Sequence, residues 1–144
     1  MAMSEDKIYL KESITYFAGM GNQIHYILDA NYDKFKTSQV TRFVKRYTEI
    51  IQSVSSATTE RAKARAKEEE EVRRKYRGSE LQNRLSSIEA NANITHGKTL
   101  TDAGDKLKDI CEDMEAAAGV KTTPVSATVK KLSRQKMSPS KRRS

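Results

Sequence analysis

The chain has 144 residues, of which 36% are hydrophobic and 32% charged, and it contains no tryptophan. This length allows one domain of ordinary size, and the shortage of apolar residues excludes a thick globular interior. The formal net charge of +8 comes entirely from the last 24 residues, which hold eight Lys or Arg and no Asp or Glu, while residues 1–120 hold nineteen basic and nineteen acidic side chains. The sequence therefore separates a neutral body from a cationic tail.

The single cysteine, Cys111, excludes an internal disulfide. It lies beside Ile110 on an apolar stripe, with no activating base nearby in the sequence, and this position predicts a buried structural thiol. No apolar run approaches the roughly 18 residues of a membrane span. Residues 1–6 lack the basic-then-apolar order of a secretory signal, so we expect an intracellular protein.

The first predicted helix covers residues 4–30, with Ser4 as its cap. Apolar residues then recur at alternating spacings of four and three, as expected for one face of a helix. This stripe consists of Leu10, Ile14, Phe17, Gly21, Ile24 and Leu28. Because each glycine in a helix interior costs roughly 1 kcal/mol relative to alanine, Gly19 and Gly21 predict a kink or a close backbone contact.

A short connection then leads to a second, antiparallel helix over about 39–77, which Thr37 or Ser38 can cap. Residues 40–54 present a broad apolar surface, whereas residues 59–77 are highly charged. Three pairs at the i,i+4 spacing can stabilise this charged half: Glu69 with Arg73, Glu70 with Arg74 and Glu71 with Lys75. We interpret it as a stiff exposed spacer. The alternative, a surface for nucleic acid, is disfavoured by the run of four consecutive glutamates.

Two further helices are predicted, over about 79–95 and 99–118, separated at His96 and Gly97, although the pattern leaves open a single bent helix. The second of them carries the cleanest heptad in the chain and ends at Gly119. Its seam consists of Leu100, Ala103, Leu107, Ile110, Met114 and Ala117. A seam of this kind pairs with a helix of the same chain or of another copy, so we predict that it is an assembly seam.

The predicted fold class is all-α: an elongated antiparallel helical hairpin or bundle with coiled-coil character over residues 4–119, followed by a disordered basic tail over residues 120–144. Eight of the nine aromatic residues lie between Tyr9 and Tyr47. We therefore expect the first helix and the first half of the second to form the best-packed part of the body.

Residues 92–99 match a relaxed phosphate-loop pattern that ends in Gly97, Lys98 and Thr99. A phosphate loop needs a buried strand before it and a helix N-terminus after it. Here a predicted helix comes first, and no β-rich apolar run exists anywhere in the chain. We interpret the segment as a helix break in which Thr99 caps the next helix.

Catalytic and metal-binding patterns are weak. Neither His25 nor His96 has a cysteine or a paired carboxylate at the spacing of metal ligands. We therefore expect no enzymatic activity, no catalytic residues, no metal site and no cofactor.

The tail carries the candidate contact residues for nucleic acid or an acidic partner: Lys121, Lys130, Lys131, Arg134, Lys136, Lys141, Arg142 and Arg143. Val125, Val129 and Leu132 would share one face if this stretch became helical, which makes it a basic amphipathic segment. Ser133 and Ser138 lie in short kinase-like contexts, and phosphorylation there would weaken a contact with phosphates. The basic clusters also resemble a loose bipartite nuclear-import signal.

These features favour a non-enzymatic scaffold that assembles through its helices as a homo- or hetero-oligomer. Its tail would give sequence-independent contact with nucleic acid in a chromosomal or viral nucleoprotein complex, which predicts a nuclear or virion-associated location. An alternative is a coiled-coil adaptor subunit of a cytoplasmic or cytoskeletal complex, whose tail binds acidic protein surfaces. A third hypothesis, a small nucleotide-binding enzyme, rests only on the segment around Lys98.

Overall fold

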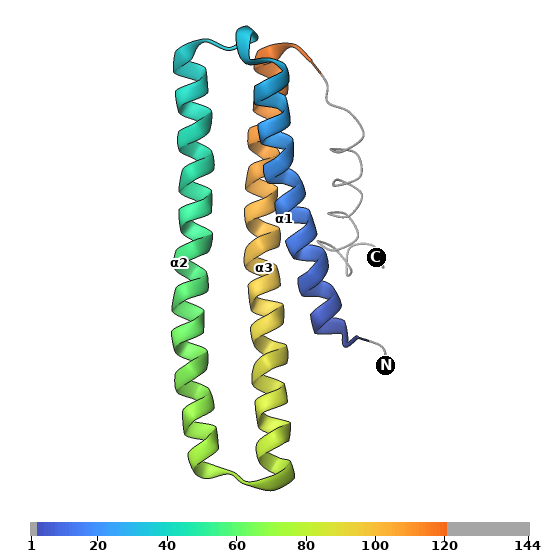
Figure 1. The fold of residues 1–144 in the computed structure, drawn as a ribbon, viewed down its shortest axis with the longest axis vertical. Helices are drawn as coiled ribbons and strands as arrows, with labels where there is room; N and C mark the ends of the chain where they lie inside the picture. Colours follow the sequence, from blue (N-terminus) through green and yellow to red (C-terminus); the bar gives the residue numbers. More distant parts are fainter. Residues whose placement is uncertain (1–2, 121–144) are drawn as a thin grey trace, which may run out of the picture.

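The computed structural model describes residues 3–120, which form three long α-helices and no strand (Figure 1). The helices are α1 (Glu5–Ala30), α2 (Thr37–Lys75) and α3 (Gly78–Ala118), and a short 3-10 turn, η1 (Tyr32–Lys34), joins the first two. The predicted all-α class, with helices arranged as a hairpin and bundle, is confirmed.

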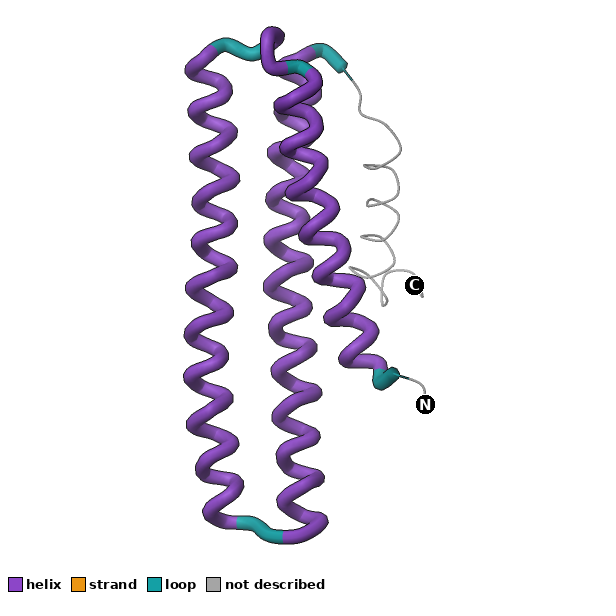
Figure 2. Tube along the Cα trace, viewed as in Figure 1, coloured by secondary structure: helices purple, strands orange, loops and turns teal. Residues whose placement is uncertain are grey.

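The helix α3 is the centre of the body, because both α1 and α2 pack on it. The chain reverses direction at η1 and again before α3, so α1 and α3 run parallel while α2 is antiparallel to both. In Figure 2, α1 starts only part of the way along the hairpin, and the lower end of the hairpin consists of α2 and α3 alone. The upper part of α2 therefore has both α1 and α3 beside it, whereas its lower part has only α3 beside it.

The tightest packing joins α1 to α3 and depends on two glycines of α3 spaced one heptad apart. A Cβ atom added at Gly97 would lie 2.6 Å from Cε2 of Tyr9, and one added at Gly104 would lie 2.6 Å from Cε2 of Tyr16. Both distances are far below a normal carbon contact, so only glycine admits the two rings. The expectation that the first helix and the first half of the second form the best-packed part of the body is correct only for the first helix, because α1 packs closely on α3 whereas α2 buries Phe43 alone.

Of the two alternatives that the sequence left open, the break between residues 95 and 99 is wrong and the single helix is correct, since α3 continues through these residues. The polar residues that suggested a break are satisfied inside the helix. Thr95 Oγ1 donates to the Asn91 carbonyl oxygen at 2.8 Å, and Thr99 Oγ1 donates to the Thr95 carbonyl oxygen at 3.2 Å. Thr99 therefore bonds to the preceding turn and does not cap a new helix.

Several helix ends follow the sequence signals. Ser4 occupies the N-cap position of α1. Gly119 ends α3 with a left-handed backbone at φ 70°, and the next N–H, that of Val120, donates to the Glu115 carbonyl oxygen at 3.0 Å. The cap of α2 differs from the prediction, because Lys36 occupies that position and its backbone N–H donates to Gln39 Oε1 at 2.8 Å.

The core lies in the half of the body where all three helices are present. Its buried members are Tyr16, Met20, Ile24, Ile27, Phe35, Phe43, Leu107, Ile110, Cys111 and Met114. Cys111 is a buried thiol, as predicted, and its Sγ–H donates to the Met20 carbonyl oxygen at 3.8 Å. Within residues 3–120, no helix combines the length and hydropathy that a bilayer crossing requires.

The charged half of α2 is helical to Lys75 and largely exposed, as expected for a stiff spacer. The predicted pair of Glu70 and Arg74 is present at 3.8 Å. Glu69, however, pairs backwards with Arg65 at 3.1 Å and not with Arg73. This pairing turns Glu69 towards the side of α2 on which a groove opens.

Candidate helix-binding groove

The helix α2 has an apolar stripe that its own chain covers only partly. Phe43 is the one buried residue among its 39. Val44 is 46% exposed, and Tyr47, Ile51 and Val54 are only half-buried. A helix that belonged fully to a closed bundle would bury such a stripe.

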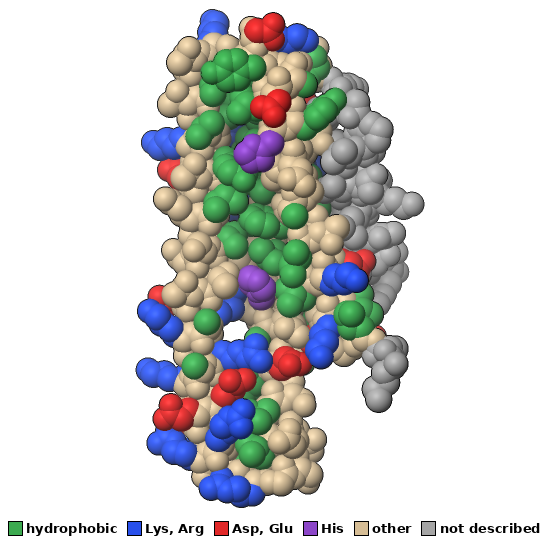
Figure 3. Space-filling model, in the orientation of Figure 1, with side chains coloured by type: hydrophobic (Ala, Val, Ile, Leu, Met, Phe, Trp, Pro, Cys, Tyr) green, Lys and Arg blue, Asp and Glu red, His purple; other side chains and the backbone are tan. Residues whose placement is uncertain are grey.

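One edge of α2 connects this apolar stripe to the charged half of the helix. Val44, Ile51, Thr58, Ala62 and Arg65 follow one another at spacings of seven, seven, four and three, so they share a single edge. In Figure 3, hydrophobic side chains form a band between α2 and α1 in the upper part of this face, and charged side chains gather below it. The edge therefore passes from apolar to charged.

Below the band, the body is hollowed where α1, α2 and α3 meet. Two adjoining hollows of about 370 and 380 Å³ share Leu10, Arg65 and Asn93, and together we call them the basal groove. Its other lining residues are Lys7, Lys11, Ile14, Thr15, Thr58, Arg61, Ala62, Ala66, Glu69, Glu89, Ala92 and His96.

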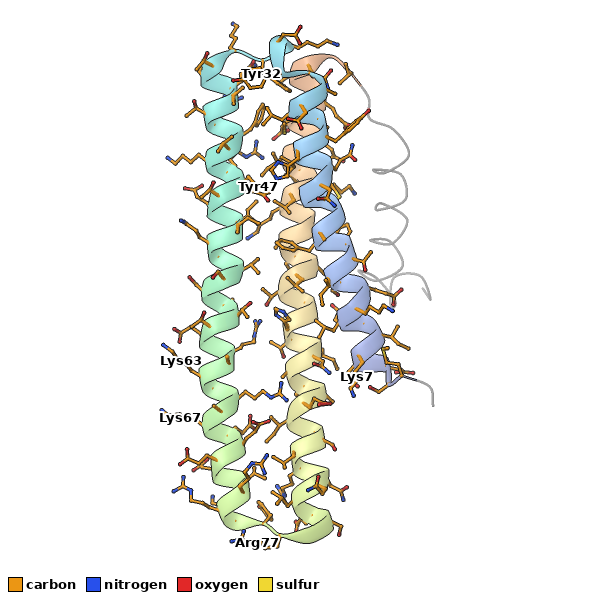
Figure 4. All side chains as sticks on the ribbon, in the orientation of Figure 1. Lys7, Tyr32, Tyr47, Lys63, Lys67 and Arg77 are labelled. Atoms are coloured by element: carbon orange, nitrogen blue, oxygen red, sulfur yellow. The ribbon has the colours of Figure 1, made fainter. Side chains whose placement is uncertain are left out.

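The basal groove is open because small side chains face one another across it. Ala62 and Ala66 of α2 lie opposite Ala92 of α3, and alanine side chains are too short to fill the space between two helix axes. Above the groove, larger groups close the same space. The Tyr47 ring meets the His25 ring edge to face, with centroids 5.5 Å apart, and in Figure 4 Tyr47 lies between α2 and α1.

The charges of the basal groove are unbalanced in favour of cations, with four cationic and two acidic lining side chains. Lys7 pairs with Glu89 at 3.5 Å, and Arg65 pairs with Glu69 at 3.1 Å. These pairs use both acids. Arg61 is different, because its Nη1 atom is buried and has no hydrogen-bond partner within residues 3–120.

His96 faces the same groove from α3. Partial burial lowers the pKa of His96, and the nearby positive charge of Arg61 lowers it further. The ring is therefore neutral at pH 7, with one nitrogen that donates and one that accepts a hydrogen bond. Across the groove, Asn93 Nδ2 donates to Asp6 Oδ2 at 2.6 Å, and this bond lowers the pKa of Asp6.

The predicted assembly seam is the internal seam of the body. Leu100, Ala103, Leu107, Ile110 and Met114 are all buried within this one chain, and only Ala117, past the last buried turn, is exposed. The seam therefore pairs with helices of its own chain and cannot serve as a surface for another. The incompletely covered surface is on α2.

The other predicted contact residues lie in the tail, outside the described residues. They are Lys121, Lys130, Lys131, Arg134, Lys136, Lys141, Arg142 and Arg143, with the phosphorylation candidates Ser133 and Ser138. The segment of Val125, Val129 and Leu132 also lies there.

The phosphate-loop segment forms no loop, since Gly97, Lys98 and Thr99 are all inside α3. Gly97 is buried against Tyr9, which explains this glycine without a nucleotide. In the part of the chain that the structure describes, no group of three or more His, Cys, Asp or Glu side chains could hold a metal ion.

The basal groove was not anticipated from the sequence, although a signal for it exists. The positions of α2 that face the interior of the body include Phe43, Tyr47 and Val54, and continuing this spacing by seven residues from Val54 leads to Arg61. An arginine in a core-facing position, next to an alanine, marks the place where the apolar core gives way to a polar groove.

Comparisons with known proteins give no relative: no family model, no curated protein and no solved structure matches the chain. Its function is therefore inferred from the geometry of the body and from the charge pattern of the sequence.

Proposed function

We propose that this protein is a non-catalytic helical scaffold whose body binds an amphipathic helix of a partner protein along the edge of α2. The α1–α3 pair is the rigid part, and α2 presents the binding edge. Binding of this type lays the apolar face of one helix into a groove and gains its free energy from apolar burial at three- and four-residue spacing.

One observation carries this proposal: α2 buries a single residue although it bears an apolar stripe. Val44 at 46% exposed and the half-buried Ile51 lie on the edge that runs into the basal groove. Covering a large aliphatic side chain contributes about 1.5–3 kcal/mol, so a partner helix that covers this edge gains substantial free energy.

The charges of the groove favour an acidic partner helix. The buried Nη1 atom of Arg61 has no hydrogen-bond partner among the described residues, and cations outnumber acids in the lining. The basic segment of the tail around Val129 is a poor occupant, because it would bring lysines against these cations. We therefore assign the edge to an acidic amphipathic helix of another protein.

A pair of substitutions on adjacent residues tests the proposal. Val44→Glu places a charge on the binding edge, whereas Lys45→Glu places one on the neighbouring exposed residue outside that edge. Full-length tagged protein is recovered from its source cells, and the partners recovered with each variant are quantified by mass spectrometry. We expect Val44→Glu to lower the recovery of a specific partner by about tenfold while Lys45→Glu leaves it unchanged. Equal recovery with both variants would contradict the proposal.

A second contact, with nucleic acid, is favoured by the charge segregation of the sequence. Eight cations in a tail without acids would release counterions from duplex DNA and give a salt slope of up to about −7 on a log-log plot. This contact would be nearly independent of nucleotide sequence, and it suits a scaffold in a nucleoprotein complex. The alternative, an adaptor in a cytoplasmic or cytoskeletal complex, would use the same tail on acidic protein surfaces.

Filter binding over a salt titration separates these two uses of the tail. The full chain is compared with a chain that ends at Val120. Loss of affinity and of the salt slope in the shorter chain supports the nucleic-acid contact. Equal affinity of the two chains would remove it and leave the adaptor alternative.

A further inference from the structure

We infer that the basal groove contains a carboxylate-binding site, in which Arg61 receives an acidic side chain of the docked partner helix. The inference deepens the proposed function and rests on it for the identity of the partner. The site itself consists of residues of this chain and can be measured without the partner.

The Nη1 atom of Arg61 is buried, and it has no hydrogen-bond partner among residues 3–120. A buried donor without a partner costs about 1–3 kcal/mol, and more when the group is charged. The guanidinium is therefore held in a position whose hydrogen bonds an incoming acceptor would complete.

Three neighbouring polar groups already have partners. Arg65 and Lys7 are occupied by Glu69 and Glu89, and the Asn93 amide is occupied by Asp6. Lys11, the fourth cation of the lining, is exposed, so Arg61 is the cation of the groove whose buried donor remains for a ligand. The hollow beside it, of about 380 Å³, is large enough for an acidic side chain.

The groups around Arg61 favour a carboxylate over a phosphate. The guanidinium presents two parallel N–H groups that match the two oxygens of a carboxylate. Glu69 lines the same hollow and Glu89 the adjoining one, and both would repel a doubly charged phosphate more strongly than a singly charged carboxylate. The neutral ring of His96, also in the lining, can donate one further hydrogen bond.

The hollow beside Arg61 adjoins the binding edge of α2. Thr58 and Ala62 line the hollow of Arg61, and they share the edge of α2 with Val44 and Ile51. A helix that lies along this edge with its apolar residues on Val44 and Ile51 passes over the hollow two to three turns further on. An acidic residue at that point would reach Arg61.

The test uses the full chain and acetate as the probe. Binding is followed by NMR through the pKa of His96, which a bound carboxylate raises. We expect saturable acetate binding that raises the pKa of His96, and weaker binding of inorganic phosphate. An unchanged His96 titration at saturating acetate would overturn the site.

Matched variants assign the effect to Arg61. Arg61→Gln should weaken acetate binding by about tenfold or more, and Arg61→Lys should weaken it less, because lysine keeps the charge but loses the paired N–H groups. Lys63→Gln removes the same charge two residues away, where the side chain points away from α3 (Figure 4), and should have no effect. Equal effects of Arg61→Gln and Lys63→Gln would overturn the inference.

A second arm distinguishes a partner side chain from a small free acid. The probe is a three-heptad amphipathic peptide with a leucine stripe flanked by glutamates, and its control has glutamine in place of every glutamate. The glutamate peptide should displace acetate from the wild-type chain, and the glutamine peptide should not. Acetate binding without competition by the glutamate peptide would overturn the assignment to a partner helix.

The two proposals can fail separately. Acetate binding that depends on Arg61, together with partner recovery that ignores Val44, would retain the site and reject the binding edge. Partner recovery that depends on Val44, with no acetate binding, would retain the edge and reject the site.

Discussion

The ring of Tyr16 lies directly on Gly104, so that a Cβ atom added to this glycine would lie 2.6 Å from Cε2 of the ring. The phenol oxygen of Tyr16 then donates a 2.6 Å hydrogen bond to Asp105, the next residue of α3. One tyrosine of α1 is therefore fixed by two consecutive residues of α3. This contact and the matching contact of Tyr9 with Gly97 set the register of α1 on α3.

Gly104→Ala should destabilise the protein, although alanine is the better helix former. The methyl group would overlap a ring that is only 1% exposed and cannot move aside freely. Overpacking costs about 1–3 kcal/mol, and the gain in helix propensity offsets about 1 kcal/mol of it. Urea denaturation followed by circular dichroism measures the difference.

Gly21→Ala is the matched control for this prediction. A Cβ atom at Gly21 would meet only the Tyr47 hydroxyl, at an ordinary 3.8 Å. This variant should therefore gain stability, by about 0.5–1 kcal/mol. A Gly104→Ala protein as stable as Gly21→Ala would show that the ring contact does not constrain the helix pair.

Tyr16→Phe should lower stability by about 1.5 kcal/mol or more, because the hydrogen bond is to a carboxylate and the ring is buried. Tyr26, which is 50% exposed, provides the comparison, and Tyr26→Phe should change the free energy of unfolding very little. Equal losses from the two substitutions would mean that the bond to Asp105 contributes nothing.

Gln23→Leu should stabilise the protein. Gln23 is fully buried on the face of α1 that also carries Met20 and Ile27, and neither polar atom of its side chain has a partner among the described residues. Burial of an unpaired amide costs about 1–3 kcal/mol in proteins, and leucine removes this cost at similar volume. Gln52→Leu, at an exposed position, should be neutral. A less stable Gln23→Leu protein would show that the amide has a role in the core.

His96 predicts a dependence of stability on pH. Its pKa is lowered in the folded state by burial and by Arg61. The unfolded chain therefore binds the proton more readily, and the protein loses stability as the pH falls from about 6.5 through the lowered pKa of the folded state. His96→Gln should remove this part of the pH dependence. Identical pH profiles of the wild type and His96→Gln would contradict the prediction.

The sequence was sufficient to predict the helices but not the way in which they pair. Apolar spacing predicted the helices, and the stop at Gly119 and the N-cap position of Ser4 agree with the structure, although the Ser4 side chain makes no capping hydrogen bond. The predicted apolar face of α1 is wrong, because only Ile24 of that stripe is buried and the other buried residues are Ser13, Tyr16, Met20, Gln23 and Ile27. Gly97 led to the wrong prediction of a helix break, because the local sequence around a glycine is the same whether it ends a helix or makes room for a ring from another helix. Only the position of Tyr9 on α1 distinguishes the two cases.

The candidate site also depends on helix packing that the sequence did not predict. The apolar edge of α2 around Val44 was visible in the sequence as a broad surface, but how much of it the chain itself covers depends on how closely α1 approaches. The basal groove depends further on three alanines that face each other from two helices. Arg61 becomes a candidate only when these positions are brought together.

Site-specific photo-crosslinking shows directly whether the edge of α2 is a surface for a partner helix. A photoreactive residue is placed at Val44 or Ile51 on the edge, or at Lys63 on the opposite side, and the crosslinked peptides of the partner are sequenced. We expect crosslinks from the two edge positions only, to partner residues about seven apart in a helix that contains acidic side chains. Equal yields from Lys63 and the edge positions would contradict this expectation.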